Sequence, residues 1–488
     1  IDEIHNIRTT SDGKSEMQKV VQNLEFLVSK IKYMKLIFLT GTPMFNGAEE
    51  IIFMLNILNL NDKQKQVKKN KIFKKDGSFQ EDGEEHLIRM ANGYISYVRG
   101  ENPYTFPHLV PPQLFDETRS FIAQKKYPTL LFNQNELNDR IEHLDLFLST
   151  LKTTQLDIYK EIMKKLVTKK GKSNQLNYTE TLLPLQTLNI CYPNDAMEDY
   201  DSDFDDSSQD KIGGIKELMT WELSGKPKVM HSFTYKNEAN PIFKRDKIGE
   251  YSTKIKTIID QIQDPSGKTA QGIILIYSQW IYYGVLPIAL ALEELGYSRF
   301  GSKTQNLINN EKNDYAYSII CGNKELSPDI NEEIDALTNE NTNGEKVKIV
   351  IISQSGTEGI DLKNIRQVHI LEPWFNMNRI EQVIGRARRN CSHKELSLDK
   401  RNVQVYLHSV EPIKTKKGSI EPIDMYLYRL GETKNKMIGK VSKILKQVSV
   451  DCLLNESQKN FSRLETKINL TLSNGKKIKD YPIKDKPY

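Results

Sequence analysis

Runs of β-branched and aromatic residues that end in glycine- or proline-containing turns constrain the fold of this chain more than any other feature. "KLIFLTGTPMFN" (35–46) leads into the apolar-periodic segment "AEEIIFMLNILN", and "KVKIVIISQSGTEGIDL" (346–362) is a nearly uninterrupted apolar run before another turn. "RQVHILEPWFNMNRIEQVIGRARR" (366–389) repeats the order of strand, turn and helix. Uniformly apolar strands followed by helices are typical of parallel sheets covered on both faces, with functional loops at the carboxyl ends of the strands. The sequence therefore predicts an α/β fold.

Two adjacent carboxylates, Asp2 and Glu3, stand at the start of the chain in "DEIH". The segment "SEMQKVVQNLEFLVSKI" (15–31), which follows them, has apolar residues at helical spacing and precedes the strand-like run at 35–46. This order predicts the end of one strand, a helix and the next strand, with Asp2 and Glu3 at a strand tip. On these residues alone, ordinary surface charge is the alternative.

Four short motifs in this chain resemble those of superfamily 2 helicases and translocases. "DEIH" and "LTGTPMFN" are similar to motifs II and III, in the Thr-Gly-Thr-Pro version typical of Swi/Snf-type proteins, and "SGTEGID" and "EQVIGRARR" are similar to motifs V and VI. The resemblance implies two RecA-like parallel-sheet lobes that bind ATP and Mg²⁺ between them, with a helical inserted region and a helical C-terminal extension. It also implies nucleic acid as a partner.

The first two motifs carry implied roles in hydrolysis. By resemblance, Asp2 would hold Mg²⁺ through water and Glu3 would position the attacking water, as metal-assisted phosphoryl transfer requires of a carboxylate pair. His5 fits the DExH pattern and is a candidate coupler between the lobes. Thr40 and Thr42 would couple the nucleotide state to lobe closure.

The last two motifs carry implied roles toward the γ-phosphate and the nucleic acid. Gln382, Arg386 and Arg389 are separated by four and three residues, so a helix through all of them would place them on one face. By resemblance both arginines act as fingers, because a planar, always charged guanidinium suits the charge spread over a transferring phosphoryl group. A solvated basic helix is the alternative. The glycine-rich turn would contact nucleotide through Gly359 and Asp361, and the nucleic-acid backbone through Ser355, Gly356 and Thr357.

Further stretches resemble the helicase-like proteins of large DNA viruses, a group that includes the small subunit of the poxvirus early transcription factor and nucleoside triphosphate phosphohydrolase I. These stretches are "GYISYVRGENPYTFP" (93–107) and "YLYRLGETKNKMIGKVSKILKQVSVDCLLN" (426–455). The resemblance implies a nucleic-acid-dependent ATPase or translocase in early viral transcription, with DNA favoured over RNA. A viral RNA polymerase or a second transcription factor subunit would be its protein partner, and the cytoplasmic viral factory and the virion its location. The alternative is a non-enzymatic, DNA-binding initiation factor that uses the ATPase core as a scaffold.

A phosphate-binding loop does not precede motif II in this sequence. The family binds triphosphate through a glycine-rich loop upstream of that motif, whereas here only Ile1 precedes Asp2. The one similar stretch, "IQDPSGKT" (262–269), has Ile262 where the loop needs glycine, and we interpret it as a turn before a strand. We therefore expect an amino-terminally truncated fragment that does not hydrolyse ATP by itself.

Charge and cysteine content limit which further kinds of site the chain can contain. Net charge is only +5, but lysines crowd residues 63–77 and 164–173, while residues 194–210 are strongly acidic. Solvated loops are the ordinary interpretation of all three runs; contact with phosphates is the alternative for the basic ones. Four scattered cysteines indicate neither a disulfide framework nor a zinc module.

The predicted organisation has four parts. Residues 1–75 are the remnant of the first lobe, 76–250 a connecting and inserted region, 251–410 the second lobe, and 411–488 a helical extension whose helix starts at Ile423 and packs on the second lobe. The uncharged stretch 273–292 is long enough to span a bilayer, but we expect a buried strand followed by a helix, and no membrane. The polar stretch 327–345 is predicted to be a surface excursion.

Overall fold

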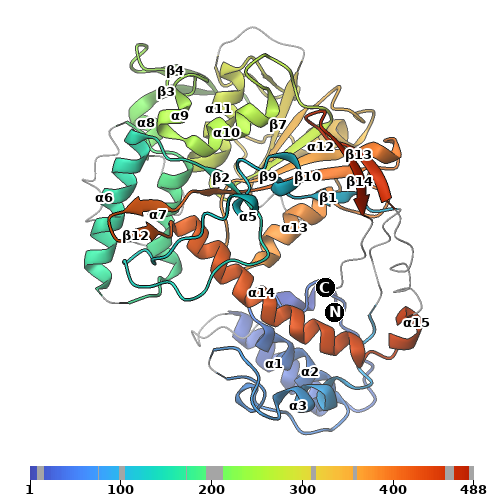
Figure 1. Cartoon of the computed structure of the whole chain (residues 1–488). Helices are drawn as coiled ribbons and strands as arrows, with labels where there is room; N and C mark the ends of the chain where they lie inside the picture. Colours follow the sequence, from blue (N-terminus) through green and yellow to red (C-terminus); the bar gives the residue numbers. More distant parts are fainter. Residues whose placement is uncertain are drawn as a thin grey trace.

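The computed structural model describes residues 1–7, 16–74, 76–97, 105–171, 173–193, 213–308, 315–354, 360–456 and 467–482. A larger body contains a twisted sheet with helices on both faces, and a smaller body contains the first three helices (Figure 1). One long helix, α14 (Ile423–Gln447), runs from the larger body to the smaller one (Figure 1).

The sheet of the larger body has eight strands in the order β1-β10-β9-β5-β8-β7-β6, with β2 also paired to β10. Every pairing in it is parallel. In the central register Leu275 lies opposite Val350 on one side and Val368 on the other. The strands are β1 (His108–Val110), β2 (Leu146–Ser149), β5 (Ile273–Tyr277), β6 (Ser298–Arg299), β7 (Ala316–Ile320), β8 (Ile349–Ile352), β9 (Ile365–Ile370) and β10 (Asn402–Val410).

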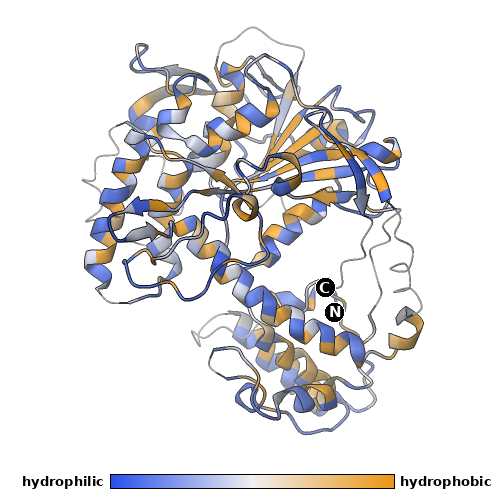
Figure 2. Cartoon of the chain, viewed as in Figure 1, coloured by the Kyte–Doolittle hydropathy of each residue, from blue (hydrophilic) through white to orange (hydrophobic). Residues whose placement is uncertain are grey.

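Alternate residues of each strand enter two separate hydrophobic cores. Ile274 and Ile276 of β5 pack in one core, while Ile273 and Leu275 pack in the other. The first core contains α6 (Thr153–Lys170), α7 (Tyr178–Asn189), α10 (Thr253–Ile262) and α11 (Leu286–Glu294); the second contains α5 (Phe121–Gln124), α12 (Ile330–Thr338) and α13 (Met377–Ala387). Because helices cover both faces, the central strands β5 and β8 are apolar at every position, and much of the sheet is orange in Figure 2. The predicted α/β parallel-sheet fold is confirmed.

Shorter elements complete the larger body. They are α4 (Pro112–Phe115), α8 (Gly213–Leu218), α9 (Ile248–Tyr251), the one-turn helices η5 (Ile281–Val285) and η7 (Leu398–Lys400), and the hairpins β3–β4 (Met219–Ser224, Val229–Tyr235), β11–β12 (Ile413–Thr415, Gly418–Ile420) and β13–β14 (Lys467–Thr471, Lys477–Pro482). Helix α15 (Cys452–Glu456) instead follows α14 at the side of the smaller body (Figure 1).

The smaller body packs α1 (Glu16–Lys30), α2 (Ile51–Asn61) and α3 (Gly83–Ala91), with the single turns η1 (Ile4–Asn6), η2 (Ala48–Glu50) and η3 (Lys69–Lys71). The strand predicted within residues 35–46 is present only as an isolated parallel bridge between Asp2 and Leu39. A strand needs backbone partners, and the start of the chain is the one described segment that pairs with it. Ile37 and Leu39 consequently remain 67% and 56% exposed.

The long helix α14 packs on both bodies rather than on the second lobe alone. Ile423 and Leu427 lie in the first core of the sheet, and Met425 lies in the second. About four turns further along, Val441 and Ile444 are buried with Met44, Leu55 and Leu87 of the smaller body. The predicted packing against the second lobe therefore describes only the first half of this helix.

The structure also bears on the predictions for the connecting region, the polar stretch 327–345 and the uncharged stretch 273–292. Strands β1 and β2, from the predicted connecting region, join the sheet of the larger body by extending along one edge of β10. The predicted surface excursion contains α12, where Glu333 is 1% exposed and pairs with Arg299 at 3.3 Å, so that prediction was wrong for this part. Residues 273–292 do form a strand followed by helix, and among the described residues no helix is long and apolar enough to cross a bilayer.

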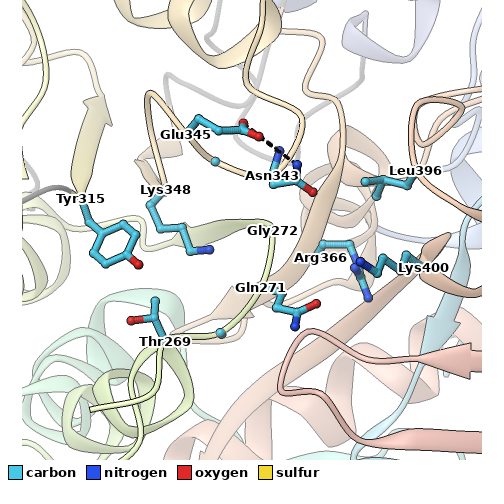
Figure 3. A pocket seen from close by; sticks show the side chains of 12 residues that line it. Thr269, Gln271, Gly272, Tyr315, Asn343, Glu345, Lys348, Arg366, Leu396 and Lys400 are labelled. Atoms are coloured by element: carbon cyan, nitrogen blue, oxygen red, sulfur yellow. Dashed lines mark hydrogen bonds between the residues drawn. The ribbon is translucent and has the colours of Figure 1, made fainter.

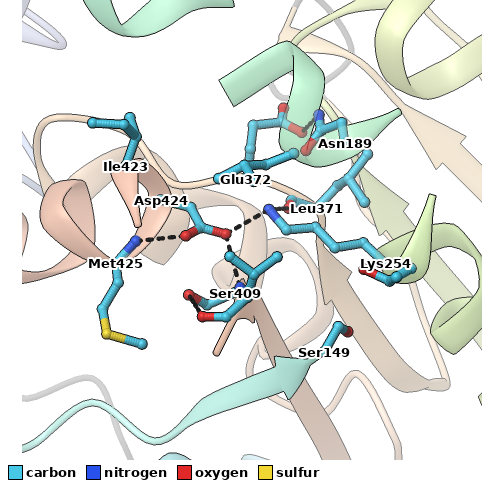
Figure 4. A network of polar contacts seen from close by, with 12 residues as sticks. Ser149, Asn189, Lys254, Leu371, Glu372, Ser409, Ile423, Asp424 and Met425 are labelled. Atoms are coloured by element: carbon cyan, nitrogen blue, oxygen red, sulfur yellow. Dashed lines mark hydrogen bonds and ion pairs between the residues drawn. The ribbon is translucent and has the colours of Figure 1, made fainter. Parts of the chain in front are cut away.

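A fully buried ion pair attaches α14 to the sheet (Figure 4). Lys254 Nζ lies 2.9 Å from Asp424 Oδ2 and donates to the carbonyl oxygen of Leu371 at 3.2 Å, and both charged side chains are 0% exposed. Asp424 also accepts hydrogen bonds from the backbone N–H groups of Val410 and Met425. This one contact joins α10, the ends of β9 and β10, and the first turn of α14.

We expect Asp424→Asn to lower the free energy of unfolding by about 3–5 kcal/mol, because it leaves the Lys254 ammonium buried without its anion. The double variant Lys254→Met/Asp424→Asn removes both charges but keeps an acceptor for Val410, so it should recover more than half of that loss. Denaturant unfolding of both variants measures the difference. Lys256→Met, which removes the partly exposed pair with Asp260 on the same helix, is the control and should cost less than about 1 kcal/mol. Equal losses in the single and double variants would contradict the expectation.

Candidate functional site

The residues of predicted motifs II and III lie together in the smaller body. His5 Nδ1 lies 2.8 Å from Thr40 Oγ1 and 3.1 Å from Glu3 Oε2, and Thr40 Oγ1 in turn accepts a hydrogen bond from the N–H of Thr42. The His5 ring is nearly buried and lies parallel to the ring of Phe45, with 6.3 Å between centroids. The two motifs, about 35 residues apart in the sequence, are therefore joined through one imidazole.

Asp2 and Glu3 end a short parallel contact with the segment around Leu39, as predicted for a strand tip. Both carboxylates are exposed, and Asp2 Oδ1 accepts a hydrogen bond from the N–H of Glu3 at 3.0 Å. Glu3 has a left-handed backbone with φ of 49°, which turns the chain away from the strand direction directly after the pair. The carboxylates thus face solvent at the end of the strand contact.

The two predicted arginine fingers converge on the end of the motif V turn. Arg386 Nη1 lies 3.3 Å from the carbonyl oxygen of Ile360, and Arg389 donates to the same oxygen at 3.2 Å and to Asp361 Oδ1 at 3.0 Å. Helix α13 ends at Ala387, so the prediction that Arg389 lies on this helix with Gln382 and Arg386 was wrong. The side chains meet because the chain turns at the helix end, not because of helical spacing. Ser355, Gly356, Thr357 and Gly359 lie outside the described residues.

Helix α13 also contacts the smaller body next to motif III. Asn378, in its first turn and 4% exposed, donates through Nδ2 to the carbonyl oxygens of Met44 and Phe45 at 2.6 and 2.5 Å. On α14, Lys434 donates to Asn46 Oδ1 at 2.9 Å and Asn435 donates to Glu381 Oε1 at 3.1 Å. The loop after motif III is thereby held by the helix that carries motif VI and by its neighbour.

Comparison with known proteins agrees with this arrangement. The family described as "Helicase conserved C-terminal domain" matches residues 254–391, which cover α10 to the end of the arginine segment. The chain contains a helicase C-terminal domain.

Several relatives of the chain come from large DNA viruses. It is 26% identical to "Putative ATP-dependent RNA helicase L377" of Acanthamoeba polyphaga mimivirus, over 96% of this chain and 42% of that protein, and 27% identical to "Putative ATP-dependent RNA helicase R563" of the same virus, over 84% and 59%. It is 24% identical to "Termination factor NPH-I homolog" of African swine fever virus, over 93% and 63%. The predicted resemblance to helicase-like proteins of large DNA viruses is confirmed. The chain spans about half the length of the first two relatives.

The stretch "IQDPSGKT" before the helicase C-terminal strands is a turn, as predicted. Asp264 Oδ1 accepts hydrogen bonds from the N–H groups of Ser266 and Lys268 and from Ser266 Oγ, and these bonds, led by that from the Ser266 hydroxyl, lower the pKa of Asp264. Its backbone donors are therefore already used by a carboxylate, and a strand rather than a helix follows. Such a turn cannot cradle a triphosphate.

A buried glutamate in the helicase C-terminal domain was missed by the sequence analysis. Glu372 lies two residues after the end of β9 and accepts hydrogen bonds from Gln279 N at 2.5 Å and Ser278 Oγ at 3.1 Å. It also accepts one from Asn189 Nδ2 at 2.7 Å (Figure 4). Burial raises its pKa to about 7. Its position two residues after a buried strand is the signal that could have identified it, because polar groups gather at the carboxyl edge of parallel sheets. No sequence pattern indicated that Asn378 would contact Met44 and Phe45.

We expect Glu372→Gln to change how stability depends on pH. Since burial raises the folded pKa above the ordinary value of about 4.5, the stabilisation from Glu372 is fully present below about pH 4.5 and is lost as pH rises through about 7. Glutamine cannot ionise, so the variant should gain about 2–3 kcal/mol relative to the unmodified protein between about pH 5 and pH 8. Denaturant unfolding at several pH values measures this gain.

Glu395→Gln is the matched control for that experiment. Hydrogen bonds from Asn364 and Thr342 lower the pKa of Glu395, so its stabilising contribution is present at higher pH and is lost as pH falls. Its removal should therefore change the pH dependence in the opposite direction. A Glu372→Gln difference that is the same at pH 5 and pH 8 would show that the carboxyl does not titrate in this range.

Proposed function

We propose that this chain is part of a nucleic-acid-dependent ATPase of the superfamily 2 translocase type that acts in viral transcription. The observation that carries the proposal is the contact between the two halves of the motif set. Asn378, eight residues before Arg386 on α13, donates to the carbonyl oxygens of Met44 and Phe45, directly after Thr42 of motif III. This contact brings the elements that bear the arginines and the carboxylates together, as a site shared between two lobes requires.

The chemistry of the motif residues supports Mg²⁺ and ATP as ligands. Asp2 and Glu3 are exposed carboxylates at the end of a strand contact, and hard oxygen ligands suit Mg²⁺, which retains much of its water. Asp2 would hold the metal through water and Glu3 would orient the attacking water. Bound Mg²⁺ would neutralise the phosphate charge. No described group of three or more His, Cys, Asp or Glu side chains is arranged to hold a metal without such a phosphate partner.

Arg386 and Arg389 would act on the γ-phosphate, and the segment that ends at Asp361 would sense the nucleotide. Arg389 now pairs with Asp361, with the two side chains 37% and 60% exposed, so this pair is solvated and weak. A triphosphate carries more charge than one carboxylate and would compete for the guanidinium. His5, between Glu3 and Thr40, would transmit the change to the segment that Asn378 holds.

The names of the relatives support nucleic acid as the second ligand and transcription as the process. We propose DNA as the track, because the motifs resemble those of Swi/Snf-type proteins and the similar African swine fever virus protein is named as a homologue of a termination factor. RNA is the alternative, since the mimivirus relatives are named as RNA helicases. The same proposal includes a viral RNA polymerase or transcription factor subunit as partner, and the cytoplasmic viral factory as location.

ATP turnover tests the proposal in the longest natural form of the protein that contains this chain. We expect duplex DNA to stimulate turnover more than single-stranded RNA does. Arg386→Lys and Arg389→Lys should each lower stimulated turnover by about 1000-fold, because an ammonium lacks the planar fork and the spread charge with which a guanidinium fits a phosphoryl group. Arg401→Lys is the control and should leave turnover unchanged, because within the described residues the Arg401 guanidinium donates to the carbonyl oxygens of Leu396 and Lys394.

Unchanged turnover in both arginine variants would contradict the finger roles. Absence of turnover with every nucleic acid, together with the same DNA footprint with and without ATP, would instead favour a non-enzymatic DNA-binding factor.

A further inference from the structure

A polar pocket lies at the amino-terminal ends of the central strands, whereas the helicase motifs follow their carboxyl ends. Thr269 and Gly272 precede β5, Lys348 precedes β8, and Arg366 lies at the start of β9, so these residues surround the amino-terminal ends of the strands. The motif loops follow the carboxyl ends of the same strands. The pocket has a volume of about 430 Å³, which lies within the range of small-molecule sites. It is therefore separate from the proposed ATPase site.

Lys348 places a nearly buried positive charge beside this pocket. The residue is 5% exposed, and the Glu345 carboxylate attracts its ammonium electrostatically, although Nζ makes no hydrogen bond or ion pair within the described part of the chain. Its backbone is fixed between neighbouring strands, since its N–H donates to Ala316 and its carbonyl accepts from Ile274. Gly344, with φ of +83°, lies so close that a Cβ there would be 3.0 Å from Lys348 Cδ. The stem is therefore held in place, and the ammonium extends into the pocket (Figure 3).

Two more cations line the same space. Arg366 is 1% exposed and is positioned by bonds from Nε to the carbonyl oxygen of Asn402 at 3.1 Å and from Nη2 to that of Thr471 at 2.5 Å. Its stem crosses Gly272, where a Cβ would lie 2.2 Å from Arg366 Cγ. Lys400, half-buried at the rim, also faces the pocket (Figure 3).

Among the described residues that line the pocket one carboxylate is present, and its oxygens accept hydrogen bonds from Asn343. Glu345 accepts hydrogen bonds from the N–H and the side-chain amide of Asn343 at 2.9 and 2.8 Å. Burial, and secondarily the neighbouring Arg366 charge, lowers the pKa of Lys348 to about 8 despite Glu345. Three cations and one occupied carboxylate leave a net positive pocket that a bound anion would stabilise.

We propose that this pocket binds a small phosphate ester of about mononucleotide size. Lys348 and Arg366 would hold the phosphate, because ammonium and guanidinium donors together suit its oxygens. Tyr315, 44% exposed and packed against Tyr297 with 5.9 Å between ring centroids, offers an aromatic surface at the pocket wall for the rest of the ligand. This site does not depend on the proposed ATPase function.

Calorimetric titration of the purified chain with inorganic phosphate and with AMP tests the proposal. We expect AMP to bind with a Kd below about 1 mM and inorganic phosphate to bind more weakly, since only AMP reaches the aromatic wall. Lys348→Met keeps the shape of the stem but removes the charge, and it should weaken AMP binding by at least about 10-fold. The same variant without ligand should melt at a higher temperature, because it removes an unpaired buried charge.

Lys346→Met is the matched control, since Lys346 is two residues away, exposed and paired with Glu340 at 3.1 Å. It should bind AMP as the unmodified chain does. If Lys348→Met does not fold, Lys400→Met at the rim replaces it and should also weaken binding. The proposal is overturned if AMP does not bind, or if it binds equally well to the Lys348 and Lys400 variants, which would place it in another site. Binding of a 5′-phosphorylated oligonucleotide without binding of AMP would also overturn it, in favour of a nucleic-acid end site.

Discussion

The buried contact between Lys254 and Asp424 is the interaction on which the arrangement of the two bodies depends. It joins the start of the helicase C-terminal domain, the carboxyl ends of two adjacent strands and the first turn of α14. Two buried charges without each other would each cost several kcal/mol, so the first turn of α14 has one favourable position on the sheet. The helix then continues for 25 residues in all, and Val441, Ile444 and Leu445 on its far half complete the core of the smaller body. A rigid helix fixed at one end thus positions motifs II and III near α13.

The sheet separates two kinds of polar chemistry at its two edges. At the carboxyl edge the geometry of parallel strands gathers Glu372, Asp361 and the arginines. Arg389 pairs with Asp361, and Glu372 accepts a hydrogen bond from the N–H of Gln279. At the amino edge Lys348 and Arg366 remain short of negative charge. The central strands are only four to six residues long, and helices cover both faces, so the two edges are distinct surfaces of one domain. Ligands bound at the amino-terminal and carboxyl ends of the central strands would contact the same strands through different residues.

Prediction from sequence succeeded where local pattern and burial agree. The runs at 273–277 and 349–352 are apolar at every position, and they form central strands with both faces buried. It failed where partners distant in the chain decide the outcome. Residues 35–39 have strand composition yet form one bridge, because few backbone groups lie beside them among the described residues. Residues 108–110 and 146–149 join the sheet through β10, about 260 to 290 residues later, and no local signal indicates such a pairing.

The sequence by itself determined the α/β class, the helicase-type motifs and the residue types available for phosphate chemistry, because these follow from hydrophobic periodicity and from short spacings along the chain. Only the tertiary structure decided how the residues meet. Arg386 and Arg389 converge through a helix end that their spacing did not predict, and Asn378 reaches Met44 and Phe45 across more than 330 residues. Lys348 and Arg366 share a pocket because β8 and β9 lie on either side of β5 and begin at the same end of the sheet. Such contacts depend on the packing of whole elements against one another, which a linear pattern does not contain.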